Sequence, residues 1–273
     1  MPPRASCDLA YNRAMPFFIG LDLAWTGHHE TGICVLEGDE CSTRLVQLDC
    51  RIDTPEGFAQ FCSGFGGDVV AAIDAPLIVL PGRRAERELG SVFGRFKASA
   101  YSANIPFLEG MKGLAGPSLA CLLAQRGFQL APSALTTRAP GRFALEVFPH
   151  PAHVVLFGLT ERIRYKKGPL AQRRAGLRRY QECLRVLLEL EMPGVSAAPE
   201  LGALLADGAI EVPGRHLKRL EDQLDAVTCA YVAFHCWNHG PERFRVFGSD
   251  EDGAIVTPWP LQSATSVRAL SSP

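Results

Sequence analysis

Hydrophobic positions follow a strand-like pattern from Phe17 onward. Short runs rich in Val, Ile, Leu and Phe, divided by glycine and polar residues, are typical of β-strands. Three such runs follow one another with short loops between them and predict a meander, namely FFIGLDLAW, TGICVLEG and TRLVQLD. Thr54 is then a candidate N-cap, and Pro55 begins a predicted helix that ends at Gly66 and Gly67. The apolar run DVVAAIDAP predicts a fourth strand, buried on both faces and parallel to its neighbour.

The alternation of helices and strands continues to the end of the chain. PSLACLLAQRGF predicts a helix, FALEVFP a fifth strand and HPAHVVLFG a short helix, followed by helices at 169–190, 199–206 and 215–239. Apolar residues of the last helix recur at spacings of three and four, at Leu217, Leu220, Leu224, Val227, Tyr231 and Phe234. Such a stripe predicts that this helix packs on the sheet. RFRVFGS and GAIVTP, on either side of an acidic turn, predict a closing hairpin.

Residues 81–116 interrupt this alternation. They begin with a short helix rich in Arg and Glu and continue with Gly, Ser, Asn and Pro, which predicts an ordered insertion or lid after the fourth strand. Because the chain shows no long linker and no repeat, we expect a single domain over residues 16–262. Residues 1–15 predict a disordered tail, with Met15 as an alternative start, and residues 263–273 a second tail.

Composition narrows the class of protein. The chain has 273 residues, of which 47% are hydrophobic, so it can bury a sizeable core. No stretch approaches the roughly 20 apolar residues of a membrane span, and no membrane association is expected. The formal net charge of −1 means that an anionic partner needs a local basic cluster. Nine cysteines without a CxxC pair predict reduced thiols and a cytoplasmic location.

Three carboxylates lie in or directly after predicted strands. Asp22 interrupts FFIGLDLAW, where the small residues Gly20 and Ala24 leave room for a ligand beside it. Asp74 ends DVVAAID, at the edge of an α/β sheet where ligands usually bind, although an Asp that caps the following turn is equally common. Glu146 repeats this arrangement near the end of the fifth strand, and its alternative is a salt bridge to Arg142 or Arg162.

Two further acids lie in the last predicted helix. Asp222 and Asp225 are three residues apart and project about 60° from each other. Both lie outside the apolar stripe, which is typical of acids on a solvated helix surface. However, AVTCAYVAF directly after Asp225 carries no charge, and a helix that is apolar all round is buried. We therefore expect Asp225 at the margin of a buried surface.

These acids would form an oxygen-only site if the fold brought them together. Such a site suits a hard cation, Mg²⁺ or Mn²⁺. Two such ions about 4 Å apart stabilise the attacking water and the leaving oxygen in phosphodiester cleavage. Repulsion between the carboxylates would keep some of them protonated until metal binds.

The order of these acids resembles the ribonuclease H-like superfamily. Its pattern is an Asp in the first strand of a three-stranded meander, an acid at the end of a fourth strand and Asp-x-x-Asp near the start of a late helix. Six segments are similar to those of the DUF429 family of predicted ribonuclease H-fold nucleases, namely GLDLAW, AIDAPL, EVFPHPAH, LFGL, YKKG and DQLDAVTCAYVA. The similarity runs in order from about Phe17 to Pro260.

The resemblance implies a fold, an activity and a set of ligands. The fold is α/β, a mixed five-stranded sheet in the order β-β-β-α-β-α-β-α with flanking helices. The activity is that of a metal-dependent nuclease, with Asp22, Asp74 and Asp225 holding Mg²⁺ or Mn²⁺. Asp222 matches an extra acid that Holliday-junction resolvases of the superfamily carry three residues earlier. Asp222 and Glu146, which falls on the EVFPH segment, are expected to assist catalysis.

A basic segment supplies candidate contacts to nucleic acid, DNA or RNA. Residues 161–185 carry nine Lys or Arg and two Glu, a net charge of +7. With Tyr165 and Tyr180 available to stack on bases, the segment predicts a strip that follows a phosphate backbone; the alternative is a solvated helix face. The candidate phosphate contacts are Lys166 and Lys167, followed by Arg83, Arg84 and Arg87.

His150 and His153 are three residues apart, but no Cys or carboxylate at a zinc-ligand spacing accompanies them. A structural zinc site is therefore not expected. His150 is expected to cap a helix or to support the site from behind its ligands, and is counted with Tyr165 among the substrate-binding candidates.

Two other functions remain open. One is a catalytically silent nucleic-acid-binding or scaffold protein of the same fold. The other is phosphoryl transfer on a small molecule, because Gly20-Leu21-Asp22 also resembles the opening of the phosphate loop of actin-like sugar kinases. The second Gly-rich loop and the duplicated domain of those kinases are absent from the sequence.

Overall fold

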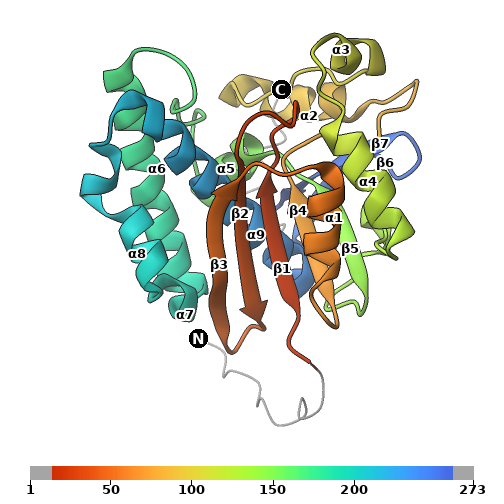
Figure 1. Cartoon of the computed structure of the whole chain (residues 1–273), viewed down its shortest axis with the longest axis horizontal. Coiled ribbons are helices and arrows are strands. Elements are labelled where there is room, and N and C mark those ends of the chain that lie inside the picture. The colour runs from red at the N-terminus through yellow and green to blue at the C-terminus, as the bar shows by residue number, and fades with distance from the viewer. Residues whose placement is uncertain (1–13, 261–273) are drawn as a thin grey trace.

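The computed structural model describes residues 14–260, so most of the predicted first tail and all of the second lie outside the described residues. Its centre is a five-stranded mixed sheet in the order β3-β2-β1-β4-β5 (Figure 1). The strands are β1 (Phe17–Asp22), β2 (Thr31–Gly38), β3 (Thr43–Arg51), β4 (Val69–Ile73) and β5 (Arg142–Glu146). β2 runs antiparallel to both of its neighbours, and β1, β4 and β5 run parallel. The predicted α/β class with a five-stranded mixed sheet and flanking helices is confirmed.

Helices cover both faces of this sheet. On one face lie α1 (Pro55–Ser63) and α4 (Ala115–Gln125). On the other face lie α5 (Pro149–Leu156), α6 (Leu170–Glu191), α7 (Pro193–Ser196), α8 (Pro199–Leu205) and α9 (Leu217–His239). Side chains alternate along a strand, so Ile19 and Leu21 of β1 join the first core and Phe18 joins the second. By the same alternation Asp22 lies on the α9 face.

The helix α9 lies directly on the sheet, as its apolar stripe predicts, and residues 224–238 are all buried. Glycine makes this close approach possible. A Cβ atom at Gly20 would lie 2.0 Å from the carbonyl oxygen of Ala226, and one at Gly32 would lie 2.0 Å from that of Asp222. The prediction that Gly20 leaves room for a ligand is therefore wrong, because the backbone of α9 fills that space.

The insertion after β4 is ordered and contains α2 (Ala85–Phe93) and α3 (Ile105–Gly110). α2 packs on a C-terminal hairpin of β6 (Phe244–Ser249) and β7 (Gly253–Pro258), which confirms the predicted hairpin. The apolar residues that they share are Ala85, Leu89, Phe93, Phe247 and Ile255. A bridge between Val147 and Val256 places the hairpin next to the end of β5. In Figure 1 the insertion lies at the upper end of the molecule, where β1 ends.

The structure bears on two predictions from composition, the absence of a membrane span and the reduced state of the cysteines. Among residues 14–260, no helix is both long enough and apolar enough to cross a membrane. Seven cysteines of the described chain are free thiols, but Cys41 is disulfide-bonded, so the prediction of reduced thiols is wrong at this residue.

Candidate functional site

Three carboxylates converge at the ends of two parallel strands and on one face of α9. One oxygen each of Asp22, Asp74 and Asp225 lies within 4.8 Å of the other two. β1 and β4 are neighbours, with Leu21 opposite Ile73, and the Asp74 N–H donates to the Leu21 carbonyl at 2.8 Å. Asp22 and Asp74 thus end adjacent strands, and α9 supplies Asp225 about two turns from its start. We call these three residues the triad.

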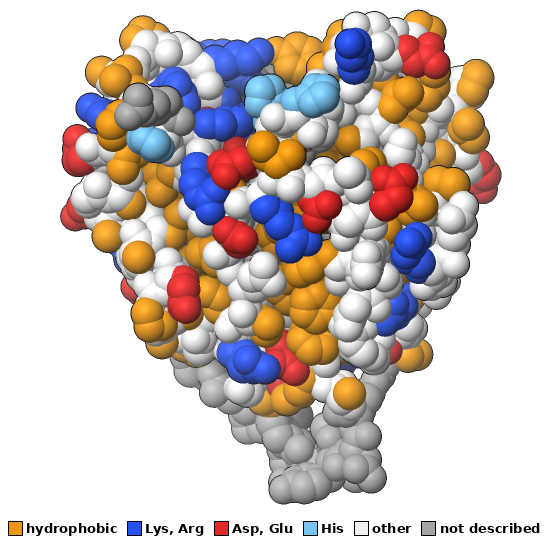
Figure 2. Space-filling model, in the orientation of Figure 1, with side chains coloured by type: hydrophobic (Ala, Val, Ile, Leu, Met, Phe, Trp, Pro, Cys, Tyr) orange, Lys and Arg blue, Asp and Glu red, His pale blue; other side chains and the backbone are white. Residues whose placement is uncertain are grey.

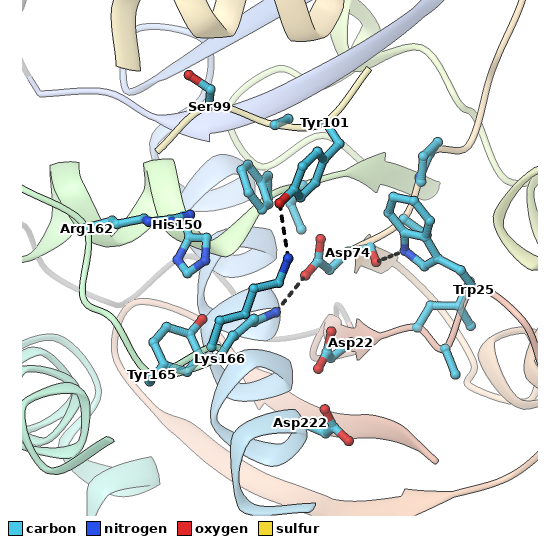
Figure 3. A pocket seen from close by; sticks show the side chains of 18 of the residues that line it. Asp22, Trp25, Asp74, Ser99, Tyr101, His150, Arg162, Tyr165, Lys166 and Asp222 are labelled. Carbon is cyan, nitrogen blue, oxygen red and sulfur yellow. Dashed lines mark hydrogen bonds and ion pairs between the residues drawn. The ribbon is translucent and has the colours of Figure 1, made fainter. Parts of the chain in front are cut away.

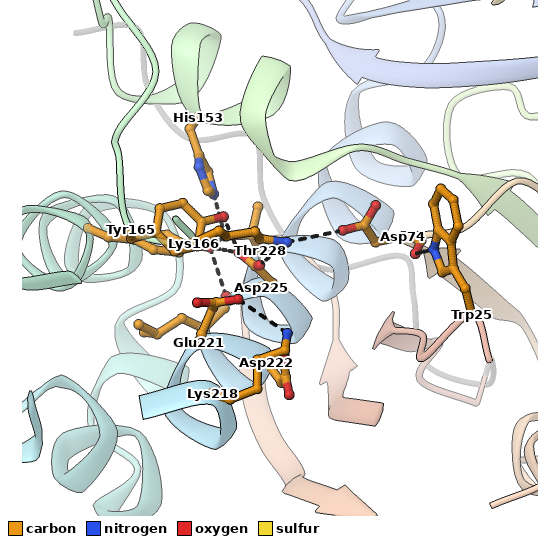
Figure 4. Close-up of polar contacts among 12 residues, drawn as sticks. Trp25, Asp74, His153, Tyr165, Lys166, Lys218, Glu221, Asp222, Asp225 and Thr228 are labelled. Atoms are coloured by element: carbon orange, nitrogen blue, oxygen red, sulfur yellow. Dashed lines mark hydrogen bonds and ion pairs between the residues drawn. The ribbon is translucent and has the colours of Figure 1, made fainter. Parts of the chain in front are cut away.

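Asp225 is the fully buried member of the triad, and hydroxyl and ammonium groups surround it (Figure 4). The Tyr165 hydroxyl donates to its Oδ1 at 2.7 Å, and the Tyr180 hydroxyl lies 3.1 Å from the same oxygen. Lys166 Nζ lies 2.8 Å from Asp225 Oδ2 and 3.8 Å from Asp74 Oδ2. Burial alone would raise the pKa of Asp225, but the positive charge of Lys166 and the hydrogen bonds from Lys166 and Tyr165 bring it below its usual value. Asp225 is therefore ionised in this arrangement.

Asp22 presents an unpaired oxygen to the same space. It is 8% exposed, and its Oδ2 is buried with no hydrogen-bond partner in the described chain. Asp222 lies beside Asp22 in Figure 3 and forms an ion pair with Lys218. Burial and the neighbouring Asp22 raise the pKa of Asp222 to about 8, against the effect of Lys218. Burial likewise raises the pKa of Asp74 well above its usual value. The site thus holds more carboxylates than its lysines neutralise.

The donor set fits a hard divalent cation. All of its ligand atoms are carboxylate oxygens, which Mg²⁺ and Mn²⁺ prefer. With metal–oxygen bonds of about 2.1 Å, oxygens on one octahedral ion lie roughly 3 to 4 Å apart, so the triad needs only a small contraction to bind one. The buried, unpaired Oδ2 of Asp22 is the kind of group that coordination to a cation would satisfy.

A cavity of about 940 Å³ opens above the triad (Figure 3), within the range of ligand pockets in proteins. Asp22, Asp74 and Asp222 line it. One wall comes from the insertion and the other from the loop between α5 and α6, with Lys97, Ser99, Tyr101, Arg162, Arg164, Lys166 and Lys167. Lys167 Nζ donates to the Tyr101 hydroxyl at 3.1 Å and joins the two walls. Figure 2 shows Lys and Arg side chains gathered beside histidines at this upper end of the molecule.

Glu146 lies outside the triad, and the alternation of the strand explains why. It is paired in register with Ile73, whose side chain belongs to the core on the α1 face. Its carboxylate forms an ion pair with Arg83 and accepts a hydrogen bond from the Leu77 N–H at 2.9 Å. Glu146 thus forms a salt bridge, but the predicted partners Arg142 and Arg162 are wrong, because Arg83 takes that place. The side chain of Arg83 is 2% exposed, so its predicted role as a phosphate contact is wrong.

The basic segment 161–185 does not form one continuous strip. Both of its tyrosines, Tyr165 and Tyr180, are fully buried, so the prediction that they stack on bases is wrong. Four of its arginines pair with acids of other segments: Arg173 with Glu221, Arg174 and Arg178 with Glu211, and Arg185 with Asp207. The part that faces the cavity is the loop from Arg162 to Lys167. Arg84, the N-cap residue of α2, and Arg87 in its first turn are exposed and lie outside the lining of the cavity.

The two histidines of α5 are buried and neutral. His150 lines the cavity with its ring 5.3 Å from that of Tyr165, and burial lowers its pKa well below the usual value. His153 has a pKa of about 3, chiefly because of burial, and its Nε2 lies 3.3 Å from Thr228 Oγ1. The N-cap of α5 is Phe148, so the predicted capping role of His150 is wrong. His150 packs against Tyr165, whose hydroxyl donates to Asp225, so His150 contacts the triad through that tyrosine.

Two residues of the site have roles that the sequence did not predict. Lys218 pairs with Asp222 four residues later, a spacing that a search for i,i+4 pairs on the last helix would have found. Trp25 donates from its indole Nε1 to the Asp74 carbonyl at 3.3 Å and lines the cavity, which no spacing in the sequence indicates.

Comparison with known proteins identifies the family of the chain. A search of curated proteins finds no match to the chain. The family model described as "Protein of unknown function (DUF429)" matches residues 20–251, a span that contains the whole triad and both walls of the cavity. The chain therefore belongs to the DUF429 family.

Proposed function

We propose that this protein is a divalent-metal-dependent nuclease that hydrolyses phosphodiester bonds at the triad. The observation that carries the proposal is the meeting of Asp22, Asp74 and Asp225 within 4.8 Å below a cavity with basic walls. Carboxylates on their own would repel a phosphodiester, so the site needs a cation before it can accept one. Mg²⁺ or Mn²⁺ held by the triad would supply activation of water and neutralisation of charge on the phosphate.

The residues of the chain itself would bind and orient the substrate. Lys167 and Arg162 carry positive charge along the cavity wall, where they would attract the phosphates on either side of the scissile bond. Arg164 of the same wall is paired with Glu161. Asp222 lines the cavity beside Asp22, where its carboxyl would be placed to assist proton transfer at the site.

The topology supports the ribonuclease H-like fold as part of this proposal. The resemblance in sequence implies acids at the ends of the first and fourth strands and near the start of a late helix. The sheet order β3-β2-β1-β4-β5 makes the first and fourth strands parallel neighbours, so two of these acids lie side by side. The pairing of Glu146 with Arg83 argues for a catalytic set without Glu146.

One observation favours a second function, a nucleic-acid-binding protein without turnover. Lys166 already pairs with Asp225 inside the triad, so the chain itself supplies a cation there. In such a protein the triad would stabilise the fold and the basic walls would still bind phosphate.

Cleavage of labelled substrates separates the two. The full chain is incubated with single-stranded DNA, duplex DNA, RNA, an RNA–DNA hybrid and a four-way junction, with Mg²⁺, Mn²⁺ or EDTA. We expect metal-dependent cleavage of at least one substrate, and a loss of roughly 100-fold or more in Asp22→Asn. Asp207→Asn is the matched control, because this carboxylate is 89% exposed. Cleavage by Asp22→Asn at the wild-type rate would overturn the proposal, and binding without cleavage on every substrate would favour the second function.

A further inference from the structure

Lys166 occupies a position in the site that its basic neighbours do not share. Its Nζ lies 2.8 Å from Asp225 Oδ2 and 3.8 Å from Asp74 Oδ2, so it contacts two members of the triad at once. The next residue, Lys167, instead bonds to Tyr101 on the far wall of the cavity. Two adjacent lysines of the same loop therefore face different partners, one the triad and one the wall.

The ammonium of Lys166 and a divalent cation would require the same oxygens. The triad offers one oxygen from each residue within 4.8 Å, and the second oxygen of Asp225, Oδ1, already accepts from Tyr165. Lys166 lies between Asp225 Oδ2 and Asp74 Oδ2, so a cation shared by these two residues would take the oxygens that the ammonium now contacts. With metal–oxygen bonds of about 2.1 Å, the ion would lie within a few ångströms of the ammonium, and two positive charges at that distance repel strongly.

The surrounding structure lets the side chain of Lys166 move while its backbone stays in place. Tyr165 is fully buried and hydrogen-bonded to Asp225, and a Cβ at Gly176 of α6 would lie 2.2 Å from the Arg164 carbonyl oxygen, so this part of the loop is packed tightly against α6. The Lys166 side chain is 27% exposed and lines the cavity. Rotation of its four-carbon chain would carry the ammonium from the triad into the cavity, where a phosphate of the substrate would lie.

We propose that Lys166 competes with the divalent cation for the triad, and that metal binding moves its ammonium from Asp225 into the cavity. The inference rests on the proposed metal site and adds an order of events to it. Lys166 becomes available to the substrate only when the cation is bound, so the protein gains its phosphate-binding lysine and its metal together.

Calorimetric titration with Mn²⁺ tests the competition without any measurement of activity. We expect Lys166→Met to bind Mn²⁺ about tenfold more tightly than wild type, because the cation no longer has to displace an ammonium. Lys167→Met is the matched control and should bind within about twofold of wild type. If Lys166→Met binds Mn²⁺ as tightly as wild type or more weakly, the competition is wrong while the metal site stands. If no variant binds Mn²⁺, both the inference and the metal site are wrong.

A second measurement uses the wild-type chain and so does not depend on how the variant folds. The protein is acylated with an amine-reactive reagent with and without Mn²⁺, and the modified peptides are quantified by mass spectrometry. Lys112, which is exposed and outside the lining of the cavity, serves as the internal reference. We expect Mn²⁺ to increase the modification of Lys166 several-fold relative to Lys112. Unchanged or reduced modification of Lys166 in the presence of Mn²⁺ would show that the ammonium does not leave the triad.

Discussion

Asp225 carries the largest number of contacts among the residues of the triad, and each contact has a physical reason. A fully buried carboxylate must be paired or neutralised, and here two tyrosine hydroxyls and one ammonium pair with it. The sequence predicted Asp225 at the margin of a buried surface, and the structure places it deeper. Its partners could not be predicted, because Tyr165, Lys166 and Tyr180 are 45 to 60 residues away along the chain.

Tyrosine-to-phenylalanine changes measure how much this pairing contributes to stability. In Tyr165→Phe the hydroxyl that donates to Asp225 is lost, and a hydrogen bond to a buried charged group is worth about 1.5 to 3 kcal/mol. We expect the free energy of unfolding in urea to fall by that amount. Tyr101→Phe is the matched control, since Tyr101 is 73% exposed, and should change stability by less than about 0.5 kcal/mol. Equal effects of the two changes would show that the Tyr165 hydroxyl does not stabilise Asp225.

His235 gives a pH dependence that is separate from the triad. Burial lowers its pKa from 6.5 to about 3. Below pH 6.5 the unfolded chain therefore takes up a proton that the folded chain does not, and stability falls as the pH falls toward 3. Between pH 6 and pH 4 we expect wild type to lose about 1.4 kcal/mol per pH unit more than His235→Gln. Urea unfolding across this range measures it, with the exposed His28→Gln as control; parallel curves for wild type and His235→Gln would contradict the prediction.

Strands and helices were the part of the structure that the sequence predicted best. Each of the five strands and the closing hairpin is present, and the last helix, predicted at 215–239, spans Leu217–His239. Periodicity works here because burial imposes it: strands alternate, and a helix on a sheet needs an apolar stripe. The same alternation accounts for the direction of Glu146. Ala144, two residues earlier, packs in the α1-face core, so Glu146 points to that face and away from the triad.

The triad depends on the close contact between β1 and α9, because Asp22 ends β1 and Asp225 lies on α9. A Cβ at Gly20 would lie 2.0 Å from the Ala226 carbonyl oxygen, so Gly20→Ala must push α9 away from the sheet. We expect a loss of about 3 kcal/mol or more in stability, beyond the usual 1 to 3 kcal/mol of overpacking, because the obstacle is backbone. Gly66→Ala is the control, since within residues 14–260 no atom beyond its chain neighbours lies within 4 Å of its Cβ position. Thermal unfolding of the two variants checks this, and wild-type stability of Gly20→Ala would contradict the described contact.

Across the molecule, the basic side chains that could contact a nucleic acid occupy a smaller surface than the sequence predicts. The basic segment 161–185 carries a net charge of +7, but much of its helical part is paired with Glu211, Asp207 and Glu221. These acidic partners follow α6 in the sequence and reach it only through tertiary packing. A count of charges along the chain therefore could not predict the ion pairs. Within the loop that lines the cavity, Arg164 pairs with Glu161 and Lys166 with Asp225. Arg162 and Lys167 therefore carry the positive charge of this wall.

The salt dependence of nucleic-acid binding tests this localisation. Each phosphate contact contributes about one unit to the slope of log K against log salt. We therefore expect Lys167→Ala to reduce the slope by about one and Lys112→Ala, an exposed lysine outside the lining of the cavity, to leave it unchanged. Fluorescence anisotropy with a labelled oligonucleotide at several salt concentrations gives the slopes. A reduction by Lys112→Ala equal to that by Lys167→Ala would mean that the cavity wall is not the binding surface.

The proposed nuclease requires a divalent cation at the triad, and anomalous diffraction from crystals soaked in Mn²⁺ detects such an ion. We expect an anomalous peak bounded by carboxylate oxygens of Asp22, Asp74 and Asp225, and the loss of that peak in crystals of Asp22→Asn. Soaked crystals of the wild-type protein with no peak at the triad, or with a peak that Asp22→Asn leaves in place, would contradict the proposal.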